Sequence, residues 1–263
     1  MSLDGKDDLL SRLVLQARQD LQRRRHLVSD DQFERAVAAY QPRDFAAALR
    51  GPGLAVIAEM KQRTPSMGVL ADDYRPADLA RAYTEGGAAA ISVLTHMAGF
   101  GGRPEHVMAA RAATDLPILR KDFLTDPYEI GEARAMGADA VLLIAAALGG
   151  GQLALLVETA RSRGVAALVE VHDESEAAAA VESGAEIVGV NHRDLRTFAI
   201  DLGLTERLRQ VIPGHVTVVA ESGIHSPEDA RRMRDAGADA ILVGEELMRS
   251  ADPNARISEL VAW

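Results

Sequence analysis

Several apolar segments of the chain end in ionisable or amide side chains. Those at the segment ends are Glu59, Lys61, Lys121, Glu170, Asn191, Arg193 and Glu221. Any one of these residues, considered alone, could simply be a surface residue that forms a salt bridge. As a set they are better explained by chemistry, because even a paired buried charge seldom stabilises a fold more than an apolar replacement. Three cations balanced by three carboxylates suit acid–base chemistry on a small anionic molecule.

Alternate residues of a β-strand point to the same side, so spacing tells which of these side chains share a face. The pairs on one face are Glu59 with Lys61, Lys121 with Phe123, and Asn191 with Arg193. In a barrel of parallel strands, the active site lies at the carboxyl ends, where inward-facing residues point into the mouth. The residues therefore predict one shared site, provided that the strands form such a barrel.

A repeated pattern indicates how the strands are arranged. Each of four segments contains a helix end, a glycine turn and an apolar run, at residues 85–94, 135–144, 182–190 and 235–244. Further apolar runs lie at 54–61, 116–123, 165–172 and 216–224, and helix signals mark the stretches 75–87, 126–138, 173–185 and 226–238. The pattern predicts an α/β fold, a single (β/α)8 TIM barrel within residues 51–263. An open doubly wound sheet is the alternative.

Residues 1–50 precede the repeat and are predicted to form a helical extension. An amphipathic helix within residues 7–25 has one apolar stripe, made of Leu9, Leu10, Leu13, Val14, Ala17 and Leu21. Residues 44–50 form a second predicted helix. We expect the extension to pack on the barrel, and a dimerisation arm is the alternative.

The turns after the last two expected strands carry glycine. Gly223 follows Glu221 and Ser222, and Gly244 precedes Glu245, each shortly before a helix. The first amides of a helix are unpaired and attract anions, and the loops after strands seven and eight of barrels often bind phosphate. The alternative is that the glycines only permit tight turns. The glycine-rich stretch 147–152 lacks the Lys and Ser/Thr of a P-loop, and we interpret it as a flexible loop.

The composition excludes several kinds of partner. The chain has 29 Lys plus Arg against 39 Asp plus Glu, and its net charge of −10 opposes binding to a nucleic-acid backbone. It has no cysteine and no histidine-rich cluster with metal-ligand spacing, so no metal is expected. No apolar run is long enough to cross a membrane, and no secretory signal is recognisable. We expect a cytoplasmic enzyme.

Together these segments resemble the indole-3-glycerol-phosphate synthase family, the barrel lyases of tryptophan biosynthesis. The resemblance is carried by IAEMKQRTPSMGVL (57–70), AAAISVLT (88–95), FGG (100–102), PILRKDFLTDPYEI (117–130), ALVEVHDESE (167–176), GVNHRDLRTF (189–198) and residues 219–249. These motifs occupy nearly every strand end between residues 54 and 249. Phosphate-binding barrels in general share the glycine turns but not this combination of charged motifs.

The resemblance implies a substrate, 1-(2-carboxyphenylamino)-1-deoxyribulose 5-phosphate, whose ring closure, decarboxylation and dehydration need no cofactor. It implies Lys121 as the general acid, Lys61 as the residue that orients and neutralises the substrate, and Glu170 as the acid/base of dehydration. Glu59, Asn191 and Glu221 support them. The implied substrate-binding residues are Arg193, Phe123, Thr64 and Ser66, and the implied phosphate-binding residues are Ser222, Gly223, Gly244 and Glu245. Because a lysine ammonium is a weak acid unless nearby cations lower its pKa, we expect Lys61 to lower the pKa of Lys121.

The chain departs from the family pattern in two loops. Thr64 replaces the usual first serine of Ser-Pro-Ser, and His96, Met97 and Ala98 replace charged residues before FGG. We expect these changes to affect substrate fit rather than reaction type. His192 also departs from the pattern, and strand parity points it away from the mouth.

Two other functions stay open at this point. One is a phosphate-sugar isomerase, whose acid/base pair is commonly carboxylate or cysteine based, whereas this chain has no cysteine. The other is a non-catalytic or differently specific phosphate-binding barrel paralogue. The presence of Lys61, Lys121 and Glu170 together argues against it. The expected partner is a small phosphorylated molecule, and the expected assembly is a monomer or a weak homodimer.

Overall fold

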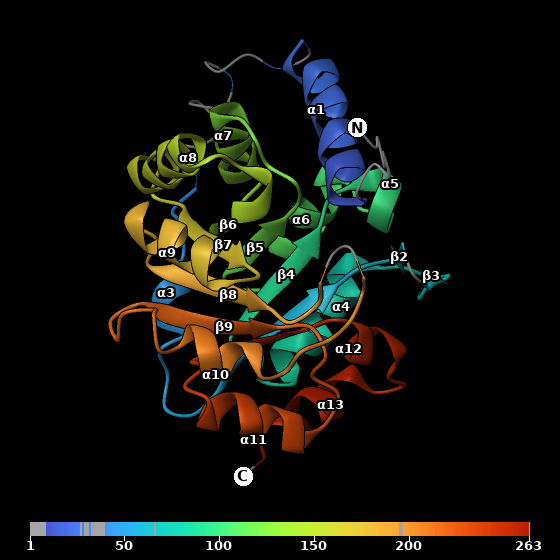
Figure 1. The fold of residues 1–263 in the computed structure, drawn as a ribbon. Coiled ribbons are helices and arrows are strands. Elements are labelled where there is room, and N and C mark those ends of the chain that lie inside the picture. The colour runs from blue at the N-terminus through green and yellow to red at the C-terminus, as the bar shows by residue number, and fades with distance from the viewer. Residues whose placement is uncertain are drawn as a thin grey trace.

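The computed structural model describes residues 9–26, 28, 32, 40–65, 67–194 and 197–262. Eight parallel strands close into a barrel in which each strand pairs with its sequence neighbours (Figure 1). They are β1 (Ala55–Met60), β4 (Ala90–Leu94), β5 (Ile118–Lys121), β6 (Ala140–Ile144), β7 (Ala166–Val171), β8 (Ile187–Asn191), β9 (Thr217–Glu221) and β10 (Ala240–Val243). The predicted (β/α)8 barrel is confirmed, because β1 pairs with both β4 and β10 and the sheet has no edge.

Helices surround the barrel and connect consecutive strands. The main ones are α4 (Pro76–Glu85), α6 (Pro104–Arg111), α7 (Pro127–Ala135), α8 (Gly150–Ser162), α9 (Glu174–Glu182), α10 (Leu204–Leu208), α11 (Pro227–Asp235), α12 (Glu245–Arg249) and α13 (Pro253–Leu260). Side chains at the predicted caps Asp126, Asp173 and Ser226 accept hydrogen bonds from backbone N–H groups of the first turn. A short helix α5 (Met97–Phe100), a 3-10 turn (Ala145–Ala147) and a hairpin of β2 (Arg63–Thr64) and β3 (Gly68–Val69) complete the connections.

One loop prediction is wrong. Residues 150–152 are not a flexible loop but the first turn of α8, because the carbonyl of Gly149 accepts hydrogen bonds from the N–H groups of Gln152 and Leu153. Leu153 is buried, as is Leu156 on the next turn. Burial of this apolar stripe outweighs the low helix propensity of glycine.

The inner face of the barrel changes from apolar to polar along β1, β5 and β7. Ile57 lies inside the barrel two residues before Glu59, and Leu119 precedes Lys121 in the same way. Leu168 likewise precedes Glu170. Because alternate residues share a face, the charged strand ends continue the inward-facing rows of the core. The charges therefore face the mouth of the barrel rather than the helix layer.

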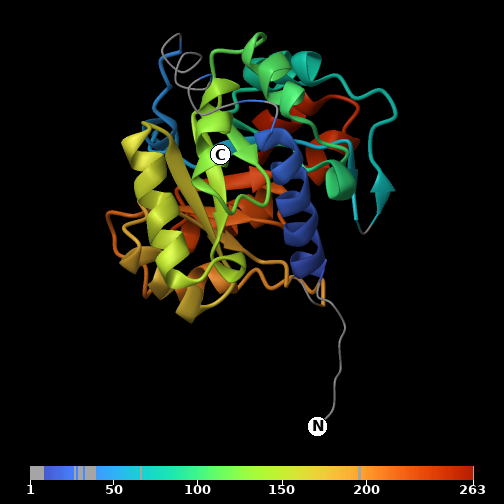
Figure 2. The same ribbon diagram turned by 90° about the horizontal axis from the view of Figure 1, so that it is seen from above.

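The N-terminal segment packs against both ends of the barrel. Helix α1 (Leu9–Arg25) lies beside α5 (Figure 1 and Figure 2), and its Leu10 and Val14 belong to the apolar cluster that fills the barrel. At the opposite end, α3 (Phe45–Ala48) places Phe45 in the same cluster, and the Arg50 guanidinium donates to Thr217 Oγ1 at 2.9 Å. We propose that residues 1–50 are an extension of the barrel domain, since they share its core.

Candidate active site

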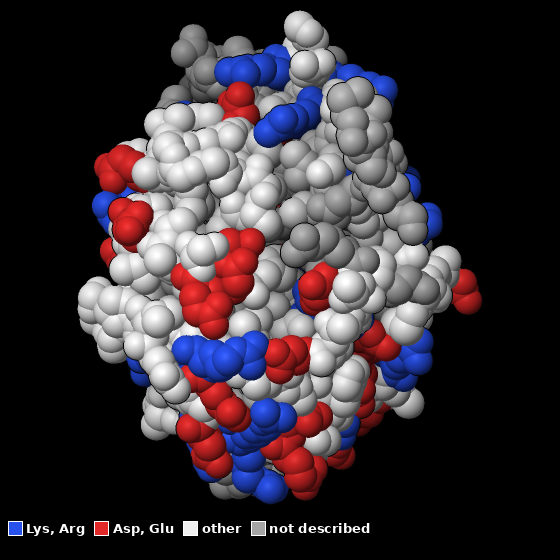
Figure 3. Space-filling view, in the orientation of Figure 1, with Lys and Arg blue, Asp and Glu red and all other residues white. Residues whose placement is uncertain are grey.

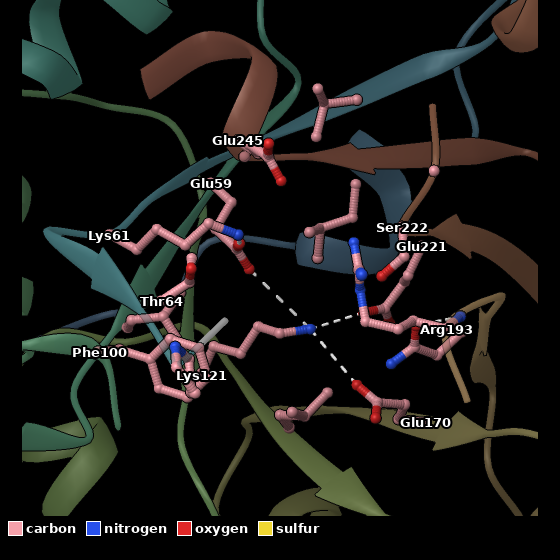
Figure 4. A pocket seen from close by; sticks show the side chains of 18 of the residues that line it. Glu59, Lys61, Thr64, Phe100, Lys121, Glu170, Arg193, Glu221, Ser222 and Glu245 are labelled. Atoms are coloured by element: carbon pink, nitrogen blue, oxygen red, sulfur yellow. Dashed lines mark hydrogen bonds and ion pairs between the residues drawn. The ribbon is translucent and has the colours of Figure 1, made fainter. Parts of the chain in front are cut away.

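A pocket opens at the carboxyl ends of the barrel strands (Figure 4). It is lined by every predicted site residue that the structure describes, namely Glu59, Lys61, Thr64, Lys121, Phe123, Glu170, Asn191, Arg193, Glu221, Ser222, Gly223, Gly244 and Glu245. Ser66, the remaining predicted residue, lies outside the described residues. Side chains from positions 59 to 245 thus converge on one cavity.

The Lys121 ammonium lies at the centre of three carboxylates. Its Nζ is 2.6 Å from Glu221 Oε2, 3.4 Å from Glu170 Oε2 and 4.0 Å from Glu59 Oε2 (Figure 4). The second lysine, Lys61, forms a separate ion pair with Glu59 Oε1 at 2.6 Å. The chain contains only three lysines, Lys6, Lys61 and Lys121, so two of them stand in this pocket.

These carboxylates set the protonation states of the site. Burial by itself lowers the pKa of Lys121, but the charges of Glu221, Glu170 and Glu59 more than offset burial, and the pKa lies above its ordinary value. The expectation that Lys61 lowers the pKa of Lys121 is therefore wrong for the ligand-free site. Burial, only partly offset by Lys121, raises the pKa of Glu221 to about 7. Burial also acts to raise the pKa of Glu59, but its two lysine neighbours bring it below the ordinary value.

The opposite side of the pocket is formed by the turns after β9 and β10. Ser222 and Gly223 both have left-handed backbone conformations, with φ of 68° and 76°. At Gly244, an added Cβ would meet Glu59 Oε1 and Lys61 Nζ, so only glycine lets the turn approach the ion pair. Glu245 is the first residue of α12, and its carboxylate lies 3.6 Å from Arg249 Nε. The group of Glu245 that is suited to an anion is therefore its backbone N–H, since the first N–H groups of a helix have no partner within the helix.

Aromatic rings form a third wall. Phe123 and Phe100 stack with ring centroids 6.4 Å apart at 27°, and His96 meets Phe123 edge-on at 5.0 Å. The His96 Nδ1 accepts a hydrogen bond from Gly99 N at 3.1 Å, so the side chain also caps α5. The loop that departs from the family pattern therefore supports a flat, apolar surface suited to a benzene ring.

Comparison with known proteins decides the family. The indole-3-glycerol phosphate synthase family model matches residues 10–260. The chain belongs to the indole-3-glycerol phosphate synthase family. It is 57% identical over 254 residues to indole-3-glycerol phosphate synthase 2 of Streptomyces coelicolor, with 96% of this chain and 98% of the relative covered. It is 48% identical to the indole-3-glycerol phosphate synthase of Streptomyces griseus, with 97% of this chain and 95% of the relative covered.

Solved structures of lower identity share the barrel. A 3-hexulose-6-phosphate synthase superposes with a TM-score of 0.62 at 17% identity, covering 80% of this chain and 99% of that one. A thiamine phosphate pyrophosphorylase from Pyrococcus furiosus gives a TM-score of 0.61 at 23% identity, covering 79% and 93%. At this level of identity the likeness supports the fold alone. The chain is an indole-3-glycerol phosphate synthase family member, and this family consists of decarboxylating lyases of tryptophan biosynthesis.

Sequence reasoning missed part of the synthase-family pocket. Phe100 lines it, and so do Leu9, Leu10 and Leu13 of α1. Phe100 belongs to the FGG motif, where a large aromatic residue beside two glycines in a loop after a strand is a signal for a binding surface. The leucines form an apolar helix stripe, and such a stripe alone does not tell which part of the barrel it covers.

The remaining predictions concern β8 and the loop that follows it. Asn191 Oδ1 accepts a hydrogen bond from Arg193 N at 3.1 Å, which orients both residues at the rim. His192 points away from the mouth, as predicted, and its ring nitrogens lie 2.9 Å from Ser222 O and 2.7 Å from Thr205 Oγ1. Among the described residues there is no group of three or more His, Cys, Asp or Glu side chains that could hold a metal ion.

Gly189 makes room for the Glu221 carboxylate, which gives a first prediction. An added Cβ at Gly189 would overlap Glu221 Oε1 inside the barrel. Gly189→Ala is therefore expected to displace this carboxylate from Lys121 and to cost about 1–3 kcal/mol, as overpacking of a core does. We expect kcat/KM for indole formation to fall at least about tenfold, the equivalent of 1.4 kcal/mol. The control is Gly214→Ala, where an added Cβ meets nothing within 4 Å, and equal activities of the two variants would contradict the prediction.

Glu221 also gives a pH-dependent stability. Its pKa rises from an ordinary 4.5 to about 7 on folding, so its contribution to stability is fully present below pH 4.5 and is lost as the pH rises through 7. Because one pKa unit corresponds to 1.36 kcal/mol, Glu221→Gln should gain about 2–3 kcal/mol of unfolding free energy relative to wild type between pH 5 and pH 8. Urea titrations at both pH values measure this change. A difference between the two proteins that stays constant with pH would be the contrary result.

Proposed function

We propose that the chain converts 1-(2-carboxyphenylamino)-1-deoxyribulose 5-phosphate into indole-3-glycerol phosphate, carbon dioxide and water. The observation that carries the proposal is the Lys121 ammonium, held by three carboxylates between an aromatic wall and two glycine turns. A molecule with a benzoate at one end and a phosphate at the other matches the two walls. The ketone between these ends would then lie near Lys121.

In the proposed ring closure, Lys121 is the general acid. The ring carbon that bears the carboxylate attacks the ketone carbon, and the Lys121 ammonium gives its proton to the ketone oxygen. Loss of carbon dioxide restores the aromatic ring. The carboxylates around Lys121 keep it protonated before the reaction, and Phe100 and Phe123 fix the orientation of the ring.

Other residues complete the proposed mechanism. The Glu170 carboxylate takes a proton from the neighbouring methylene and gives it to the leaving hydroxyl, which leaves as water and forms the indole. Lys61 orients the substrate and neutralises its charge, and Arg193 binds on the carboxylate side. The substrate contacts Thr64 and Ser66 in the loop after β1. The proposed phosphate-binding groups are Ser222, Gly223, Gly244 and the backbone N–H of Glu245.

Two carboxylates are supporting groups in this proposal. Among the described residues, the buried acceptors Glu59 Oε2 and Glu221 Oε1 have no hydrogen-bond partner. Buried acceptors of this kind are normally satisfied, so they suit the hydroxyl groups of the sugar chain. Asn191 extends the same polar surface toward the rim.

We also propose a monomer or weak homodimer in the cytoplasm, where amino acids are made. The apolar stripe of α1 is buried against its own barrel, which removes the support for a dimerisation arm.

On the face shown in Figure 3, acidic and basic side chains are interspersed over the lower part, over α10, α11 and α13, rather than forming a basic patch. Within the described residues, no helix combines the length and apolar character needed to cross a bilayer.

The proposal is tested with the synthetic substrate and indole fluorescence. We expect a fluorescence rise with the phosphorylated substrate and a much smaller rate with its dephosphorylated analogue. A melting temperature that the substrate raises without any fluorescence rise would instead support the non-catalytic phosphate-binding paralogue. No fluorescence rise and no thermal shift would reject both.

A further inference from the structure

Two ionisable side chains continue from Glu170 away from the pocket. Glu170 uses both carboxylate oxygens: Oε2 is 3.4 Å from Lys121 Nζ, and Oε1 is 3.4 Å from His172 Nε2. The other ring nitrogen of His172, Nδ1, is 3.1 Å from Glu176 Oε2. Lys121, Glu170, His172 and Glu176 thus form one row of neighbouring ionisable groups, in which His172 Nε2 meets Glu170 at ion-pair distance and has no hydrogen-bond partner among the described residues.

This row leads from the buried site toward solvent. The side chain of Glu170 is 4% exposed, that of His172 is 15% exposed, and that of Glu176 on α9 is 20% exposed. Neither His172 nor Glu176 lines the pocket, so a bound substrate leaves their solvent side open. The backbone N–H of His172 also donates to Glu176 Oε2 at 2.8 Å, which fixes the two residues relative to each other.

The proposed reaction consumes one proton in each turnover. The substrate carboxylate is negative, whereas carbon dioxide and water leave as neutral molecules, so the products carry one negative charge fewer. Dehydration is neutral overall, because the proton given to the leaving hydroxyl is balanced by the proton removed from the methylene. The proton that Lys121 gives to the ketone oxygen is not recovered and must come from solvent.

We propose that His172 is the route by which a solvent proton returns, through Glu170, to Lys121. This inference rests on the proposed function. After ring closure, His172 gives its Nε2 proton to Glu170 Oε1. The carboxyl group rotates and delivers the proton to the neutral amine of Lys121, and His172 takes a new proton from solvent on the Glu176 side.

The surroundings of His172 suit an imidazolium that can give up a proton. Burial by itself lowers the pKa of His172, but the hydrogen bond with Glu176 and the charges of Glu170, Glu176 and Glu221 raise it above its ordinary value. The groups facing the ring are Glu170 from β7, Asp173 and Glu176 from the start of α9, and Glu221 from β9. All of them are acidic, so they favour the charged ring: Glu176 is the hydrogen-bond partner of Nδ1, and Glu170 lies at ion-pair distance from Nε2.

The test compares the rate constant of the first turnover with that of later turnovers in the His172→Gln enzyme. Because Lys121 is already protonated in the resting enzyme, the first turnover should keep the wild-type rate constant. Later turnovers wait for the proton and should slow about tenfold or more, as when general acid–base assistance is lost. Stopped-flow indole fluorescence should therefore show a burst of one product per site followed by a slow phase. The slow phase should lose the wild-type dependence on pH.

Three comparisons make the result decisive. Glu176→Gln alters the solvent end of the row, and a milder slowing of later turnovers with an unchanged first turnover supports the route. His215→Gln, an exposed histidine in the turn before β9, should behave as wild type. A His172→Gln enzyme that slows the first and later turnovers equally, or that slows neither, overturns the inference. If the wild-type protein forms no indole product, the proposed function fails instead.

Discussion

Lys121→Arg is expected to lower kcat for indole formation by about 10²- to 10⁴-fold while the protein stays folded, as loss of a general acid does. An arginine keeps a positive charge among Glu59, Glu170 and Glu221, so these carboxylates are not left unpaired. A guanidinium, however, does not release a proton in a protein, and its planar shape differs from that of an ammonium. Single-turnover fluorescence with excess enzyme measures the effect on the chemical step directly.

The control for Lys121→Arg is Lys61→Gln. Lys61 has one close carboxylate partner, Glu59, and we assign it to substrate orientation rather than proton donation. Its replacement is therefore expected to raise KM more than it lowers kcat. Lys121→Gln is a less suitable test, because it leaves the buried carboxylates of Glu170 and Glu221 without the lysine between them and destabilises the protein. Retention of more than about a tenth of kcat in a folded Lys121→Arg enzyme would contradict the assignment of the general acid.

The strand pattern was sufficient to predict where the polar side chains meet. Eight apolar runs with helix signals between them left few topologies other than a closed barrel, and strand parity then placed Glu59 and Lys61 on the inner face. The same parity placed His192 outside the mouth. These predictions succeed because the period of a strand is fixed by backbone geometry and does not depend on distant residues.

Properties that depend on distances across the barrel could not be predicted. The sequence does not tell which charge stands nearest to Lys121, and the structure places carboxylates there where we expected a cation to act. The same limit applies to Leu13 of α1, since a helix stripe does not specify the surface it covers. Phe100 and Gly189 likewise acquire their roles from side chains of other strands and loops.

The residue before Lys121 gives the last prediction and illustrates the same limit. Arg120 points out of the barrel and is fully buried, with its guanidinium 2.8 Å from Glu132 Oε2, 3.5 Å from Asp122 Oδ2 and 3.2 Å from Thr95 Oγ1. Arg24 of α1 approaches Glu132 Oε1 at 2.7 Å from the other side. This ion network joins the helix over the mouth to the strand that carries Lys121. Arg120 alternates with Lys121 and therefore faces the helix layer, where its partners on α7 accommodate its charge.

Arg120→Leu should lower the free energy of unfolding by about 3–5 kcal/mol, because it removes the cation that Asp122 and Glu132 share in a buried network and leaves Glu132 with Arg24 alone. Leucine fills much of the space, so loss of charge rather than a cavity dominates the change. Urea denaturation measures the free energy of unfolding of Arg120→Leu. The control is Arg81→Leu, because the Arg81 ion pair with Asp78 is exposed and is worth at most about 1 kcal/mol. Equal stabilities of the two variants would mean that the network contributes no more than a surface pair.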